Sequence, residues 1–194
     1  MTAPVVLVLP GFQDSGPEHW QSHWVREDPA TFRRVEQADW DRPRLRDWVT
    51  ALDDAVTAAA TPAGGPVLLA AHSLGCITIT HWAAGAPAAA RAVTGALLVA
   101  PADVDTAEVP ELVGFRPIPL RPLPFPSTVV ASSDDPWCSP GRARAFAAGW
   151  GSRHVELGPY GHLNADSGLG SWPEGRTLLA ASGGHDAGHR ARTP

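Results

Sequence analysis

Short apolar runs alternate with helix-like segments along most of this chain, and this rhythm constrains the fold more than any other feature. The runs are rich in β-branched residues, and segments of helical periodicity separate them. Such alternation is typical of a parallel sheet joined by helical crossovers. We therefore expect a doubly wound α/β sheet with helices on both faces and strand order 2-1-3-4-5-6. Its six strands are expected at residues 5–9, 32–36, 67–71, 96–100, 128–131 and 154–157.

The helical segments have their own signals. The clearest pattern covers residues 44–60, with the apolar side chains on one face. Another helix is expected from Pro140 behind Ser139 as N-cap, and further helices after Pro17, Ser73 and Pro173. Residues 110–126 contain six prolines, so we expect a stiff irregular loop there and no cap domain.

The length of 194 residues is that of one domain, expected at residues 1–182. The tail at 183–194 is small, polar and aperiodic, which predicts disorder. No apolar stretch reaches the roughly 20 residues of a membrane helix. Because a strand-like segment follows the first residues directly, without a basic leader, we expect a cytoplasmic protein.

Charge and cysteine content exclude several functions. A net charge of -5 without a basic stripe gives no reason to expect nucleic acid or a membrane as partner. All 15 basic residues are arginine, so lysine Schiff bases and the lysine-dependent phosphate loop are excluded. The two cysteines, Cys76 and Cys138, are too few for a disulfide framework or a zinc site and are expected as buried thiols.

Three polar residues fall just past the carboxyl ends of expected strands, where ligands collect in such sheets. Ser73 follows the third strand, Asp135 the fifth and His162 the sixth. Serine, acid and histidine in this chain order are typical of the α/β-hydrolase triad. We interpret Ser73 as a nucleophile, His162 as its base and Asp135 as the acid that orients the base.

The stretch AAHSLGC at residues 70–76 surrounds the candidate nucleophile. The usual nucleophile elbow reads Gly-x-Ser-x-Gly, and here Ala71 stands at the first glycine position while Gly75 keeps the second. Taken alone, Ser73 is equally well explained as a strand-end serine that caps a helix. The acid and the histidine farther along the chain favour the nucleophile.

The other candidate roles are less firmly specified by sequence. Asp134 adjoins Asp135 and competes for the acid role, and Asp103 after the fourth strand is a more remote alternative. The backbone N–H groups of Phe12 and Leu74 are the expected oxyanion donors. His72 is expected as a hydrogen-bonding residue that lines the site, and His19 as an ordinary packed or solvated helix histidine.

Four motifs together resemble one known family: PGF with the following GPEHWQSHW, AHSLG, SSDDPW and YGHLN. They are similar to those of small cap-less α/β-hydrolases such as retinoblastoma-binding protein nine and the YdeN-like serine hydrolases, over nearly the whole chain before the tail. The resemblance implies a serine hydrolase with Ser73, Asp135 and His162 in the triad and with neither a metal nor an organic cofactor. It also implies esterase-like activity on small acyl substrates. No Leu-x-Cys-x-Glu segment supports a retinoblastoma-type protein partner, so a protein partner stays unknown.

Without a cap domain, we expect a shallow, fairly open cleft for small or extended acyl groups. Its predicted lining is Phe12, His72, Phe115, Trp137 and Leu163. Cleavage of small acyl esters is the leading hypothesis. Amide or peptide cleavage by the same triad, a protein-interaction module on a hydrolase scaffold and a flavodoxin-like cofactor domain are the alternatives. The last is disfavoured because the first loop has one glycine where a phosphate cradle needs several.

Overall fold

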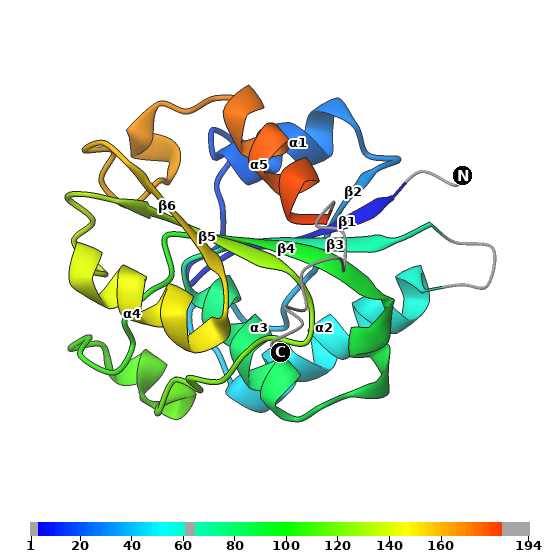
Figure 1. The fold of residues 1–194 in the computed structure, drawn as a ribbon, viewed down its shortest axis with the longest axis horizontal. Helices are drawn as coiled ribbons and strands as arrows, with labels where there is room; N and C mark the ends of the chain where they lie inside the picture. The colour runs from blue at the N-terminus through cyan, green and yellow to red at the C-terminus, as the bar shows by residue number, and fades with distance from the viewer. Residues whose placement is uncertain (1–3, 61–64, 184–194) are drawn as a thin grey trace, which may run out of the picture.

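The sheet lies at the centre of the molecule. In the computed structural model, which describes residues 4–60 and 65–183, six parallel strands pair in the order β2-β1-β3-β4-β5-β6 (Figure 1). Both the α/β class and the predicted strand order are confirmed. The strands are β1 (Val5–Leu9), β2 (Phe32–Arg34), β3 (Val67–His72), β4 (Val93–Val99), β5 (Ser127–Ser132) and β6 (Arg153–Leu157).

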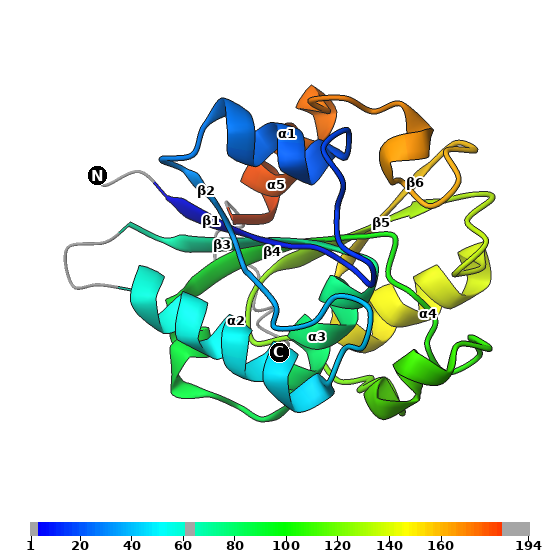
Figure 2. The ribbon, with the colours of Figure 1, turned by 180° about the vertical axis from the view of Figure 1, so that it is seen from behind.

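Helices cover both faces of the sheet. Helices α1 (Trp20–Glu27) and α5 (Pro173–Gly183) lie together on one face. Helices α2 (Leu45–Ala59), α3 (Leu74–Ala84) and α4 (Pro140–Trp150) lie on the other, as Figures 1 and 2 show from opposite sides. This arrangement is the doubly wound one that the alternation of patterns predicts.

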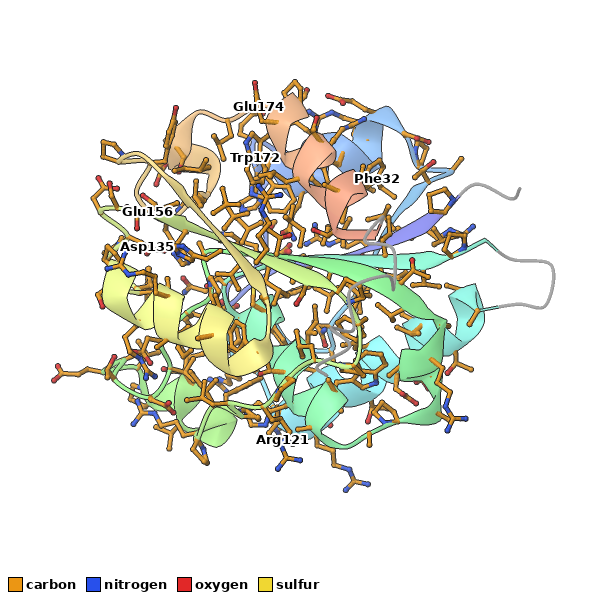
Figure 3. All side chains as sticks on the ribbon, in the orientation of Figure 1. Phe32, Arg121, Asp135, Glu156, Trp172 and Glu174 are labelled. Atoms are coloured by element: carbon orange, nitrogen blue, oxygen red, sulfur yellow. The ribbon has the colours of Figure 1, made fainter. Side chains whose placement is uncertain are left out.

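Two hydrophobic cores result, one on each face of the sheet. In β1, Val6 and Val8 belong to the core under α1 and α5, whereas Leu7 and Leu9 belong to the core on the other face. This assignment follows the two-residue period of a strand, and both sets are apolar because the sheet is covered twice. Figure 3 shows Trp172 on the α5 side, in the first of these cores.

Some boundaries differ from the predicted ones. Helix α2 begins at Leu45 with Arg44 as its N-cap, and β4 begins at Val93, three residues before the predicted start. The proline-rich segment opens with the 3-10 helix η2 (Pro110–Phe115), where Pro110 fits because the first helical residue needs no N–H. Gly183, predicted in the tail, is the last residue of α5. The rest of the predicted disordered tail lies outside the described residues.

No cap domain separates β4 from β5. Within the described residues that link them, η2 is the one helical element. None of the helices in the described ranges has the length and apolar character needed to cross a membrane.

A close backbone contact holds the start of α3 against the end of β1. A methyl group added at Gly75, near the start of α3, would lie 2.5 Å from the carbonyl oxygen of Leu9 and 2.7 Å from that of Pro10. The start of α3 therefore packs directly on the backbone at the end of β1. Only glycine permits an approach this close.

We predict that Gly75→Ala lowers the free energy of unfolding by about 2 kcal/mol, because the added methyl group overlaps two backbone oxygens and forces a backbone shift. Urea unfolding measures the effect. Gly16→Ala is the matched control, since a methyl group there meets no atom within 4 Å. Equal stability of the two variants would contradict the packing described above.

Candidate active site

Ser73 occupies a sharp turn between β3 and α3. Its backbone has φ 52° and ψ -119°, a positive-φ conformation outside the left-handed helical region that costs a side-chain-bearing residue about 1–3 kcal/mol. The turn is held on both sides, because the N–H of Ser73 donates to the carbonyl of Val99 at 3.0 Å and its carbonyl accepts from the N–H of Cys76 at 3.0 Å. The hydroxyl is thereby directed away from the sheet, toward the loops.

The loop after β1 packs against this turn. A methyl group at Gly11 would lie 2.8 Å from Cβ of Ser73, so glycine is required for the loop to come this close. Ala71, which replaces the first glycine of the usual elbow motif, is fully buried and pairs with Leu9 and Leu98 of the neighbouring strands. Its methyl group fits in the core, so the departure from the motif leaves the turn intact.

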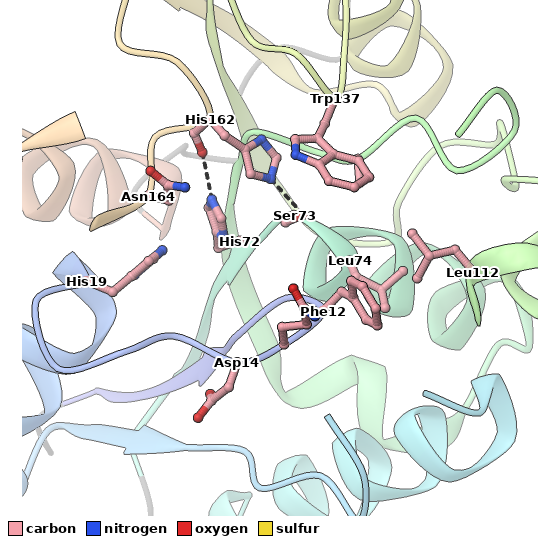
Figure 4. Close-up of a pocket in the computed structure, with 12 residues that line it drawn as sticks. Phe12, Asp14, His19, His72, Ser73, Leu74, Leu112, Trp137, His162 and Asn164 are labelled. Carbon is pink, nitrogen blue, oxygen red and sulfur yellow. Dashed lines mark hydrogen bonds between the residues drawn. The ribbon is translucent and has the colours of Figure 1, made fainter. Parts of the chain in front are cut away.

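The structure brings Ser73, His162 and Asp135 into one hydrogen-bonded chain. Nε2 of His162 lies 2.9 Å from Oγ of Ser73 (Figure 4). Nδ1 of His162 lies 2.9 and 3.0 Å from the two carboxylate oxygens of Asp135. The Asp135 side chain is 1% exposed and also accepts the N–H of Trp137 at 2.9 Å. The carboxylate is thus fixed where it orients the imidazole.

The two competing acids are engaged elsewhere. Asp134 accepts hydrogen bonds from the Ser132 hydroxyl and the Gly161 N–H, and these bonds lower the pKa of its carboxyl. Asp103 forms a bidentate pair with Arg142, with both N–O distances at 2.8 Å. Asp134 therefore shapes the loop that carries the histidine, and Asp103 belongs to a separate ion pair.

The backbone around His162 is anchored on both sides. Nε2 of His72 donates to the carbonyl of His162 at 2.8 Å, and the indole N–H of Trp20 donates to the carbonyl of Leu163 at 3.0 Å. Burial lowers the pKa of His72 well below its usual value, so its ring is neutral. His72 thus has the hydrogen-bonding position that its sequence neighbourhood predicts.

Two residues that line the cavity with Ser73 have backbone N–H groups without an acceptor among the described residues. Leu74 is the first residue of α3, so its N–H has no acceptor within the helix. The N–H of Phe12 donates no hydrogen bond to any acceptor in the described part of the chain. Both are therefore available to a negatively charged oxygen bound beside Ser73.

A cavity of about 170 Å³ opens above Ser73. One side, which we call the apolar wall, consists of Phe12, Leu74, Leu112 and Trp137 (Figure 4). A wider groove adjoins the cavity beyond His162, where Trp137 and Tyr160 are exposed.

The opposite side of the cavity, which we call the polar wall, consists of His19, His72 and Asn164. The three imidazoles of His19, His72 and His162 lie in a row, with ring centroids 4.6 and 4.8 Å apart and edge-to-face orientation. The substrate space is therefore apolar on one side and polar on the other.

Two predicted lining residues lie elsewhere, and six residues that line the cavity were not predicted to do so. Phe115 is fully buried against Trp48, because its 3-10 helix presents Leu112 to the cavity. Leu163 is fully buried in the core under α1, since its positive φ of 49° turns it away from the cavity. The residues missed are Gln13, Asp14, His19, Ala102, Leu112 and Asn164. For His19 and Asn164, the signal was present in the quoted GPEHWQSHW and YGHLN motifs.

Neither cysteine has the character of a reactive thiol. Cys76 and Cys138 are free and buried. Burial raises the pKa of both, that of Cys138 to about 12. Among the described residues, no group of three or more His, Cys, Asp or Glu side chains is arranged to hold a metal ion.

Comparison with known proteins is consistent with the resemblance seen in the motifs. The chain matches the family described as serine hydrolase over residues 6–181. It is similar to the solved structure of a YdeN-like hydrolase from Pectobacterium atrosepticum, with 33% identity, TM-score 0.80, and 93% of this chain and 91% of that chain covered.

More distant structures share the fold. The ydeN gene product of B. subtilis has 20% identity and TM-score 0.70, with 93% of this chain and 98% of that chain covered. Est1E from Butyrivibrio proteoclasticus has 12% identity and TM-score 0.66, with 94% and 86% covered. A search of curated protein sequences found no match.

The buried His19 predicts how stability depends on pH. Burial, with the nearby His162 and His23, lowers its pKa from 6.5 to about 3. Between these values the unfolded chain binds a proton at His19 that the folded protein does not, so stability falls as the pH falls below 6.5. From pH 7 to 5, this one group lowers the free energy of unfolding by about 2 kcal/mol.

In His19→Ser, we expect the free energy of unfolding to fall by about 2 kcal/mol less between pH 7 and pH 5 than in the native protein. Serine does not titrate, and its hydroxyl keeps an acceptor for the helix N-terminus. Denaturant unfolding at pH 7 and 5 measures this fall in both proteins. An identical pH dependence in the two would contradict a neutral, buried His19.

Proposed function

Because the chain belongs to the serine hydrolase family, we propose that it cleaves esters of small acyl groups through a covalent acyl-enzyme on Ser73. The observation that carries this proposal is the unbroken chain of hydrogen bonds from the Ser73 hydroxyl through His162 to Asp135. A serine hydroxyl is a weak nucleophile at neutral pH and needs such a base.

In the first half of the proposed reaction, Oγ of Ser73 attacks the ester carbonyl while Nε2 of His162 takes the hydroxyl proton. Asp135 holds the Nδ1 proton of the same ring and stabilises the imidazolium that forms. The N–H groups of Phe12 and Leu74 bind the oxyanion. When the tetrahedral intermediate collapses, the bond to the alcohol oxygen breaks and His162 donates the proton to it.

In the second half, a water molecule attacks the Ser73 ester. His162 takes a proton from this water and returns a proton to Oγ of Ser73 when the acyl bond breaks. One ester and one water give one acid and one alcohol. Each proton movement therefore uses a group already within hydrogen-bonding distance of Ser73.

The cleft has two parts, the small cavity beside Ser73 and the wider groove beyond His162, and each suits one half of the ester. The cavity beside Ser73 is small, about 170 Å³, and suits the acyl group. The wider groove is lined by His162, which gives its proton to the leaving group, and by the exposed Trp137 and Tyr160. We place the alcohol there.

Fluorophosphonate labelling tests the nucleophile and the acid. We expect the native protein to label and Ser73→Ala not to label. Asp135→Asn is expected to lower ester turnover by about ten-thousand-fold, as loss of the triad acid does elsewhere. Asp134→Asn is the matched control and is expected to retain most activity, because Asp134 bonds the loop and not the imidazole. Labelling that survives Ser73→Ala, or a greater loss in Asp134→Asn, would refute the assignment.

The cavity size predicts a limit on acyl length. Its volume equals that of about six water molecules. We expect kcat/KM for p-nitrophenyl esters to be highest for acyl chains of about two to six carbons and to fall at least tenfold by ten carbons. A rise in kcat/KM through ten carbons would contradict the placement of the acyl group in this cavity.

A further inference from the structure

His19 presents a buried hydrogen-bond donor to the cavity. The residue is 3% exposed and stands at the N-cap of α1, where Nδ1 accepts the N–H of Gln21 at 3.2 Å. Since Nδ1 is the acceptor in that bond, the proton of the neutral ring lies on Nε2. The low pKa of about 3 keeps the ring in this neutral form.

The Nε2–H of His19 has no hydrogen-bond partner among the described residues. A buried donor without a partner destabilises the folded protein, so such groups are uncommon and call for an explanation. Figure 4 shows the outer end of the ring directed toward the space between His72 and Asn164, which both line the cavity.

Asn164 adds a second donor to the same side. Its Oδ1 accepts the N–H of Asp166 at 3.1 Å, which fixes the amide orientation. The NH₂ group of the amide is therefore the part left to face a ligand. Two neutral donors, from α1 and from the loop after β6, thus converge on the polar wall.

Charges around the cavity favour a neutral acceptor. No arginine is among the residues found to line the cavity, and the chain has no lysine. Asp14, the one carboxylate among the residues found to line the cavity, is already paired with Arg34. A carboxylate on the substrate would therefore lose its hydration without gaining a cation.

We propose that the polar wall recognises an uncharged oxygen on the acyl chain, an ether, hydroxyl or carbonyl, through hydrogen bonds from His19 Nε2 and the Asn164 amide. This rests on the proposed function, because the acyl group must occupy the cavity beside Ser73. The substrate class is then a short oxygen-substituted acyl ester. His19 is a specificity residue and takes no part in bond breaking.

The test uses isosteric ester pairs. In the acyl pair, p-nitrophenyl methoxyacetate and butyrate differ by one oxygen in place of one methylene. In the alcohol pair, the acetates of 2-methoxyethanol and n-butanol differ in the same way. The ratio of kcat/KM within each pair is measured for native protein, for His19→Ser and for His23→Ser, the same change on the outer side of α1. Comparison between proteins cancels the intrinsic reactivity of the esters.

We expect the methoxyacetate-to-butyrate ratio to fall about tenfold in His19→Ser, the effect of one neutral hydrogen bond, and to stay unchanged in His23→Ser. The alcohol pair is expected to show no change in either variant. A structural role alone would slow both members of a pair equally. An unchanged acyl ratio, or a change confined to the alcohol pair, would overturn the proposal.

A binding measurement keeps this proposal separate from the proposed function. In Ser73→Ala, which cannot form the acyl-enzyme, we expect the imidazole Nε2–H NMR signal of His19 to move downfield with methoxyacetamide and not with butyramide. If native protein hydrolyses no ester and does not label, the proposed function fails and the NMR shift still decides the recognition. If neither amide moves this signal, the proposed recognition by His19 is refuted.

Discussion

The conformation of Ser73 depends on how closely the end of β1 approaches the turn between β3 and α3. A non-glycine residue keeps a positive φ only where its surroundings over-determine it, and here Gly11 and Gly75 allow backbone to pack against both sides of the turn. The buried amide of Gln21 reinforces this contact, because it donates to the carbonyl of Leu9 at the end of β1 and to that of Ala70 within β3. The same approach brings Phe12 to the cavity beside Ser73.

A second constraint links α1 to the loop that carries His162. The row of imidazoles runs from His19 through His72 to His162, and His72 hydrogen-bonds the His162 backbone. Burial keeps the rings of His19 and His72 neutral. Neutral rings pack edge-to-face without repulsion and leave an N–H donor at each step. The segment GPEHWQSHW therefore builds one side of the cavity as well as the core under α1.

The sequence predicted what depends on periodicity and chain order, and it missed what depends on side-chain direction. Strand order and the rim positions of Ser73, Asp135 and His162 follow from alternating apolar patterns and right-handed crossovers, which are properties of the whole segment. The exclusion of Phe115 and Leu163 from the cavity follows from local backbone: a 3-10 turn in one case and a φ of 49° in the other. His19 was predicted to be an ordinary helix residue, but it is the N-cap of α1, and its ring accepts a hydrogen bond from the Gln21 N–H at the end of that helix.

Without a cap domain, selectivity must come from the loops that the sheet itself presents. Leu112 reaches the cavity because η2 is held against the loop after β4 by hydrogen bonds from Arg116 to the carbonyls of Val104 and Ala107. Asn164 reaches it through a capping box that fixes the turn after His162. Both positions lie outside the hydrogen-bonded chain of Ser73, His162 and Asp135. In the proposed reaction, a substitution at Leu112, which is not part of the turn after His162, can change which acyl group fits and leave the bond-breaking geometry as it is. One minimal hydrolase scaffold can serve different substrates in this way.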